Sequence, residues 1–307
     1  MKGGQSQLIL NKRNELLKSK TNPKKRNEEQ TVLQKADSKD SAVENPKRAG
    51  NKPDPVKEST TEKVKIDKAL SEAKSRPFDT EAIDFKYVRN TALQPETGII
   101  NLIDPCHEYK SFATAAGLER TRLQAKFARE VIKFGSGCLN VRTNGTIHFG
   151  VMDSVENTGY SHGEIIGVPV NDKDIYVDAL DHIEKCFTNS SQMEAVRHCI
   201  RPPRFVEVID KDSRVNHCVI EVDIVPTAKI VSGKLFTVRL PKFNEKSNKV
   251  EFEKRTTYRR VGAKTEPISE DDQVDFILGM QERDKRREEA ESTRHENPSD
   301  TCVGLQM

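Results

Sequence analysis

The chain has 307 residues, of which 34% are hydrophobic and 32% charged, and its formal net charge is +3 at pH 7. Ordinary domains are roughly 45–50% apolar on a count that includes Gly, so part of this chain is expected not to fold. No apolar run approaches the ~20 residues of a membrane span or the core of a secretory signal, and six cysteines without a Cys-x-x-Cys pair are typical of a reduced, intracellular protein.

Residues 1–75 carry 18 Lys and Arg against 11 Asp and Glu, with only scattered apolar side chains. Such a segment cannot bury enough surface to offset its ordering entropy, so we expect a disordered basic linker. Residues 76–280 hold 28 basic and 30 acidic residues and are expected to form one folded domain; residues 281–307 form a charged tail, helical or disordered. Because this domain is slightly acidic overall, it can bind nucleic acid only through a local patch.

Hydrophobic periodicity and turn residues predict that the folded part is a mixed α/β (α+β) domain. Strands are expected at 99–103, 107–112, 145–151, 165–170, 205–209, 218–225, 235–240 and 249–261. Helices are expected at 121–135, 174–187, 192–198 and 271–292. A Gly-bearing loop joins strands 145–151 and 165–170, which indicates a hairpin.

The predicted helix 121–135 carries four cations that we call the basic stripe: Arg122, Lys126, Arg129 and Lys133. Their spacing of i, i+4, i+7 and i+11 places them within about 60° of one another, over a rise of about 16 Å. A neighbouring apolar stripe is formed by Leu123, Phe127, Val131 and Phe134. Like charges at i, i+4 destabilise a helix, so the pattern favours contact with duplex phosphates over the alternative of a solvated helix face.

Acidic residues at the ends of predicted strands suggest a second kind of site. Glu108 and Lys110 share one face of strand 107–112, Asp153 follows strand 145–151, and Glu96 lies in the turn before the first strand. Converging carboxylates can bind Mg²⁺ or Mn²⁺, which activates water for phosphodiester cleavage, and Lys110 would offset phosphate charge. Glu96, Glu108 and Asp153 are therefore the candidate catalytic residues, with Glu108 and Asp153 as metal ligands; ordinary surface acids are the alternative.

A zinc site is a third hypothesis. Cys186, the pair His198–Cys199 and the pair His217–Cys218 have suitable side chains. Without a Cys-x-x-Cys pair, buried free thiols explain the same residues.

Four motifs, in order along the chain, resemble the divergent AlbA-type (Schlafen-like) domain over about residues 90–265. They are the strand motif H-E-Y-K-S-F at 107–112, the glycine-bearing strand 143–151, the returning strand 162–168 and the late strand 258–262. The resemblance implies a mixed α/β domain that binds double-stranded RNA or DNA in the cytoplasm. It also implies that Lys110, Lys126 and Lys133 contact the duplex.

Schlafen-type relatives are metal-dependent RNases that cut transfer RNA, so the resemblance implies a divalent-metal-dependent endoribonuclease as an alternative function. Glu108 and Asp153 match the second and third acids of that family, but Ile103 occupies the position of the first acid. This departure from the family pattern weakens the case for RNA cleavage more than the case for RNA binding. The segment L-Q-P-E-T-G-I-I-N-L-I-D-P at 93–105 further resembles interferon-linked antiviral factors that carry this domain among other modules. This resemblance implies that the chain is a fragment or short form of such a factor. A protein-interaction module, with helix 271–292 as the partner surface, is the remaining alternative.

Overall fold

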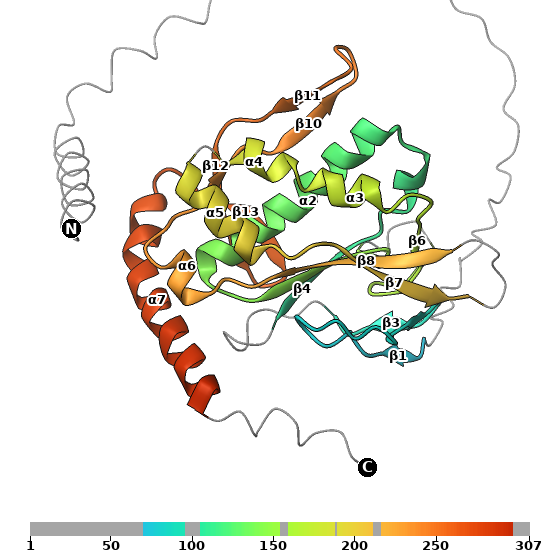
Figure 1. Cartoon of the computed structure of the whole chain (residues 1–307), viewed down its shortest axis with the longest axis horizontal. Helices are drawn as coiled ribbons and strands as arrows, with labels where there is room; N and C mark the ends of the chain where they lie inside the picture. The colour runs from blue at the N-terminus through green and yellow to red at the C-terminus, as the bar shows by residue number, and fades with distance from the viewer. Residues whose placement is uncertain (1–69, 96–104, 154–158, 188, 211–215, 297–307) are drawn as a thin grey trace, which may run out of the picture. The chain divides into compact units, whose positions relative to one another are not determined.

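The computed structural model describes residues 70–95, 105–153, 159–187, 189–210 and 216–296, and all of them belong to one compact unit (Figure 1). The predicted mixed α/β fold is confirmed. Residues 1–69 of the expected linker, the predicted strand 99–103 and Glu96 lie outside the described residues.

A six-stranded sheet forms the centre of the unit, with strand order β2-β7-β8-β5-β4 and β6 paired to β8. The strands are β2 (Tyr87–Val88), β4 (Cys106–Lys110), β5 (Gly145–Phe149), β6 (Val168–Pro169), β7 (Arg204–Ile209) and β8 (His217–Ile224). β4 lies parallel to β5, and β8 runs antiparallel to both β5 and β7. The expected hairpin is reduced to a single antiparallel bridge between Val151 and Ile165, because β6 pairs with β8 instead of β5.

Helix α2 (Arg120–Val141) packs on one face of this sheet (Figure 1). The Glu119 side chain caps its first turn by accepting hydrogen bonds from the Thr121 and Arg122 amides. The predicted apolar stripe is buried, with each of its four residues at most 4% exposed. The helix runs beyond the predicted end at 135. Gly137 lies within it against β12 and β13, where a Cβ would come 3.0 Å from Thr265 Cγ2.

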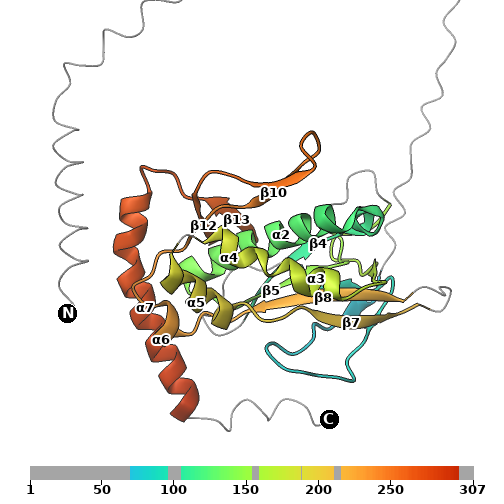
Figure 2. The same cartoon turned by 45° about the horizontal axis from the view of Figure 1, so that its top comes forward.

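A second β-layer lies against α2. Strands β9 (Thr237–Val238), β12 (Thr256–Val261) and β13 (Lys264–Pro267) form a three-stranded sheet, and β12 contacts the helix. Strands β10 (Pro241–Asn244) and β11 (Lys249–Phe252) form a hairpin that also contacts α2 and projects from the unit (Figure 2). The predicted single strand 249–261 is thus two strands, β11 and β12, in different sheets.

Short helices and a long terminal helix complete the unit. They are η2 (Ala113–Gly117), α3 (Asp174–Ala179), α4 (His182–Cys186), α5 (Ser190–Cys199), α6 (Ala228–Val231) and α7 (Gln273–Glu296). The predicted helix 174–187 is divided between α3 and α4. Helix α7 is fixed to the end of α2 by an ion pair of the fully buried Arg142 with Asp284.

The face of the sheet opposite α2 is covered by residues 70–95. This segment contains β1 (Glu72–Ala73) and β3 (Ala92–Leu93), a parallel pair that the sequence did not predict (Figure 1). Tyr87 and Leu93 of this segment pack with Tyr109 and Val219 in a small core separate from that of α2. The ordered fold therefore begins before residue 76.

Candidate nucleic-acid interface

The basic stripe lies along the outer side of α2, and its cations are exposed or half-buried. Arg122 and Lys126 are exposed, and Arg129 and Lys133 are half-buried. Lys126 Nζ lies 5.1 Å from the centroid of the Phe112 ring, a cation–π contact that leaves the ammonium open to solvent. Among the described residues, no carboxylate lies within ion-pair distance of Lys126 or Lys133.

Both arginines of the stripe are held by glutamates of the β10–β11 hairpin, one in its turn and one directly after β11. Arg122 Nη2 lies 2.8 Å from Glu245 Oε1 in the turn. Arg129 Nη1 and Nη2 lie 3.0 and 3.1 Å from the two carboxylate oxygens of Glu253, a bidentate pair. Lys126 and Lys133 are therefore the cations of the stripe that are available without breaking an ion pair.

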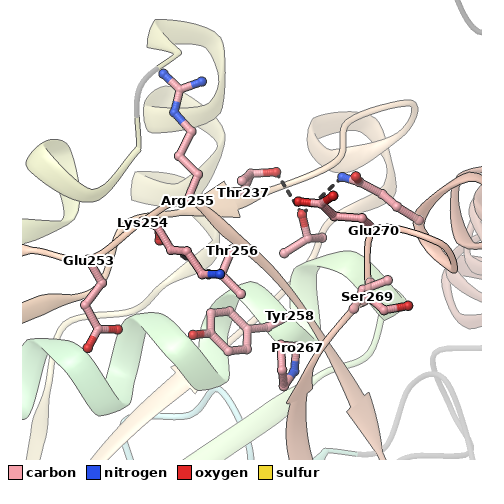
Figure 3. Close-up of a pocket in the computed structure, with 12 residues that line it drawn as sticks. Thr237, Glu253, Lys254, Arg255, Thr256, Tyr258, Pro267, Ser269 and Glu270 are labelled. Atoms are coloured by element: carbon pink, nitrogen blue, oxygen red, sulfur yellow. Dashed lines mark hydrogen bonds between the residues drawn. The ribbon is translucent and has the colours of Figure 1, made fainter. Parts of the chain in front are cut away.

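Two further cations come directly after Glu253 in the chain. Lys254 and Arg255 are exposed at the edge of a cavity of about 810 Å³ that Glu253, Tyr258, Ser269 and Glu270 also line (Figure 3). Arg255 points away from Glu253 in this view. The sequence analysis did not select them, although two adjacent cations follow the predicted strand residues Lys249–Phe252.

Lys110 lies inside a cluster of carboxylates. Its Nζ is 3.2 Å from Glu108 Oε1, 3.7 Å from Asp153 Oδ2 and 4.0 Å from Glu130 Oε2. Burial lowers the pKa of Lys110, but the three carboxylates outweigh burial and raise it. The structure places Glu108 and Asp153 around the same ammonium group, that of Lys110. Lys110 can bind a phosphate only by giving up these partners.

The second oxygen of Glu108 is also occupied. Glu108 is buried, and Oε2 accepts hydrogen bonds from Arg260 Nη1 and from Thr265 Oγ1, the latter at 2.9 Å. Arg260 comes from β12 and Thr265 from β13, so this carboxylate joins the two β-layers. Within the described ranges, no group of three or more His, Cys, Asp or Glu side chains could hold a metal ion. Glu96 lies outside those ranges.

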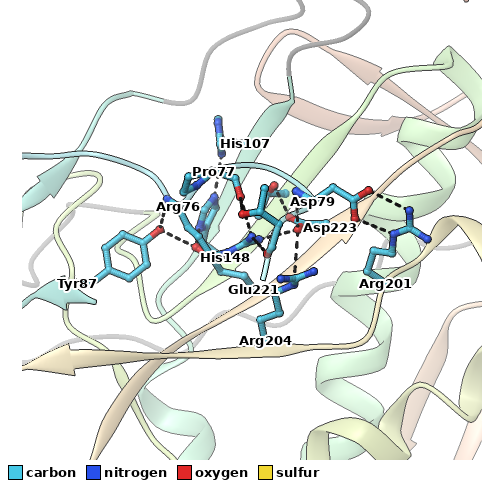
Figure 4. Close-up of polar contacts among 12 residues, drawn as sticks. Arg76, Pro77, Asp79, Tyr87, His107, His148, Arg201, Arg204, Glu221 and Asp223 are labelled. Carbon is cyan, nitrogen blue, oxygen red and sulfur yellow. Dashed lines mark hydrogen bonds and ion pairs between the residues drawn. The ribbon is translucent and has the colours of Figure 1, made fainter. Parts of the chain in front are cut away.

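The sequence analysis missed a buried polar network on the opposite face of the sheet (Figure 4). Glu221 of β8 accepts hydrogen bonds from Arg76 Nε, from Tyr87 Oη at 2.6 Å and from His148 Nδ1 at 3.0 Å. Burial opposes ionisation of Glu221, but His148 and Arg76 outweigh it and hold the pKa of this carboxyl at about 2. Arg76 also pairs with Asp223 at 2.6 Å.

His107 extends this network toward the surface. His107 Nδ1 lies 2.9 Å from His148 Nε2, and its ring also lines a cavity of about 510 Å³ beside Glu72, Lys74 and Gln94. Burial, with a contribution from His148, lowers the pKa of His107 to about 4. The network attaches residues 70–95 to the sheet, and its signal in the sequence was a pair of acids, Glu221 and Asp223, inside an otherwise apolar strand.

None of the helices among the described residues is long and apolar enough to span a bilayer. No family model matches the chain.

Three curated proteins are similar in sequence. Human sterile alpha motif domain-containing protein 9-like is 36% identical over 209 residues, which is 67% of this chain and 13% of that protein. The mouse 9-like protein is 40% identical over 166 residues, 53% of this chain and 10% of that protein. Human sterile alpha motif domain-containing protein 9 is 39% identical over 175 residues, 56% of this chain and 11% of that protein. The alignments therefore span only about a tenth of each relative's length.

Proposed function

We propose that the described domain of this chain, which is related to the sterile alpha motif domain-containing protein 9 proteins, binds the phosphate backbone of double-stranded nucleic acid through α2. One observation carries the proposal. On an otherwise slightly acidic domain, four cations that are exposed or half-buried align on one helix face, and Lys126 and Lys133 have no carboxylate partner among the described residues.

The spacing of these two lysines suits a duplex. Seven residues of α-helix rise about 10.5 Å, and duplex DNA carries one charge per ~1.7 Å of its axis, so both ammonium groups can meet phosphates at once. Lys254 and Arg255, which directly follow the Arg129 partner Glu253, are also exposed and add positive charge. Backbone contacts of this kind carry no sequence information, so we expect RNA and DNA duplexes to bind with little sequence preference.

The resemblance of the sequence to interferon-linked antiviral factors extends the proposal to a cytoplasmic role in antiviral innate defence. In that role the ligand is a viral or cellular duplex, including structured RNA such as transfer RNA. The other modules of a longer parent protein would then determine the response to binding.

Charge reversal of the two lysines tests binding. We expect Lys126→Glu/Lys133→Glu to weaken retention of a labelled RNA duplex by about 10-fold or more at low salt, because two attractive contacts become repulsive. The matched control is Lys229→Glu/Lys285→Glu, which makes the same charge change at exposed sites on α6 and α7. Equal retention by the two double variants refutes the assignment to α2, and no binding of the unmodified protein at low salt favours a protein-interaction module.

A second candidate function is metal-dependent cleavage of structured RNA, and one observation favours it: Glu108 and Asp153 converge around Lys110. As arranged, these residues do not fit a divalent ion, because Lys110 Nζ lies between the carboxylates and Arg260 binds the remaining oxygen of Glu108. We therefore derive no catalytic step through a metal.

Incubation of the protein with transfer RNA and Mn²⁺ or Mg²⁺, followed by a denaturing gel, tests this candidate. Asp153→Asn is the informative variant, since Asp153 is partly exposed and its loss leaves no buried cation unpaired. Fragments that disappear in this variant support cleavage. Intact RNA with either ion leaves binding as the function.

A further inference from the structure

Glu245 in the turn of the β10–β11 hairpin and Glu253 directly after it bind the arginine N–H groups that a phosphate would use. Arg122 presents Nη2 to Glu245, and Arg129 presents both Nη1 and Nη2 to Glu253. A guanidinium recognises carboxylate and phosphate with the same planar N–H groups. One set of N–H groups cannot serve both anions fully, so hairpin and duplex compete for these arginines.

We propose that the β10–β11 hairpin is an autoinhibitory competitor, whose glutamates neutralise the arginines of the basic stripe until a duplex displaces them. This inference rests on the proposed function, since it concerns the regulation of the same site. It explains why two of the four stripe cations are paired with the hairpin, while Lys126 and Lys133 have no carboxylate partner among the described residues.

The two ion pairs differ in how firmly they hold. Arg129 and Glu253 are both about one-third exposed, and Arg129 also lies 3.3 Å from the Pro241 carbonyl at the base of the hairpin. Arg122 and Glu245 are 45% and 70% exposed and share one contact at the tip. The Arg129 pair therefore holds more firmly, and the tip pair is the one that a phosphate displaces first.

The size of the effect depends on the exposure of the tip pair. Exposed ion pairs contribute little, equivalent to about a 1.4- to 5-fold change in an equilibrium constant. A duplex that must first displace Glu245 from Arg122 loses affinity by that factor. Removal of the Glu245 charge should restore it.

The experiment compares Glu245→Gln with Glu251→Gln, each in the full chain. Glu251 lies on the exposed side of the same hairpin, where it accepts hydrogen bonds from Asn244 and Ser247. The two substitutions change charge equally and differ in the Arg122 contact. We expect Glu245→Gln to bind an RNA duplex about 1.4- to 5-fold more tightly than Glu251→Gln, and we expect this gain to vanish in an Arg122→Gln background.

Two outcomes overturn the inference alone. Equal affinities of Glu245→Gln and Glu251→Gln would show that the pair is only structural. A gain that persists with Arg122→Gln would show a general effect of charge and not release of this arginine. Failure of the proposed function looks different, because the unmodified protein would then show no binding to the duplex at low salt, and both claims would fall.

Discussion

Helix α7 belongs to the folded unit, and substitution of its Asp284 tests whether the helix stabilises that unit. Arg142, at the end of α2, is fully buried and its guanidinium pairs with Asp284, while Asp284 Oδ2 also accepts the Gly233 amide at 2.8 Å. Arg287, also buried, donates to Asn144 Oδ1 at 2.8 Å, one turn further along α7. Asp284→Ala removes the charge partner of this buried guanidinium, and we predict that it lowers the free energy of unfolding of the domain.

The cost of that change is large relative to the stability of a domain. Removing one partner of a buried ion pair typically costs about 3–5 kcal/mol, against a total of about 5–15 kcal/mol. Urea denaturation of the full chain measures the change, with Glu282→Ala as control because Glu282 is on the exposed side of the same helix. We expect the control to cost about 0.5 kcal/mol or less. Equal costs for Asp284→Ala and Glu282→Ala would refute the role of α7 as a structural clamp.

Two further predictions concern the sheet. The pKa of His107 is about 4 in the folded protein and near 6.5 in the unfolded chain, so as pH falls the unfolded chain binds the proton first. The free energy of unfolding is therefore unaffected by this group above pH ~6.5 and decreases as pH falls from there toward 4. Unfolding measured at pH 7 and pH 4.5 should therefore show about 2–3 kcal/mol less acid destabilisation in His107→Gln than in the unmodified protein, and an identical pH profile would contradict the assignment. Gly150 has φ +98°, and a Cβ there would lie 2.9 Å from Gly167 Cα, whereas Gly159 has φ +73° with open space around it. Gly150→Ala should therefore lower the free energy of unfolding by about 2 kcal/mol or more, a larger loss than that caused by Gly159→Ala.

The sequence was most informative where local pattern and burial coincide. The apolar stripe of α2 has helical periodicity, and the alternation of Glu108 and Tyr109 on strand β4 places them on opposite faces of the sheet, as expected. The end of α2 was not predictable in this way, because Gly135 and Gly137 suggest a break. In the structure both lie within the helix, at positions where close packing against Ile200 and Thr265 leaves room only for small residues.

The features that were missed depend on contacts between distant residues. Arg76 is one cation in a basic segment, and only the fold brings it to Glu221 and Asp223, about 145 residues away in the chain. The pairing of Arg122 and Arg129 with the hairpin likewise depends on how β10 and β11 pack against α2. Periodicity identified the stripe, but it could not show that half of the stripe is already neutralised.

The salt dependence of duplex binding tests the central claim most directly. The association constant of the full chain for a labelled duplex is measured between about 50 and 300 mM salt, because the release of counterions from the duplex makes binding by cations salt-dependent. If the four stripe cations contact phosphates, the log–log slope is about −3 to −4, and it becomes shallower by about 2 in Lys126→Gln/Lys133→Gln. A slope near zero, or the same slope in the double variant, would contradict the account of α2 as a phosphate-binding helix.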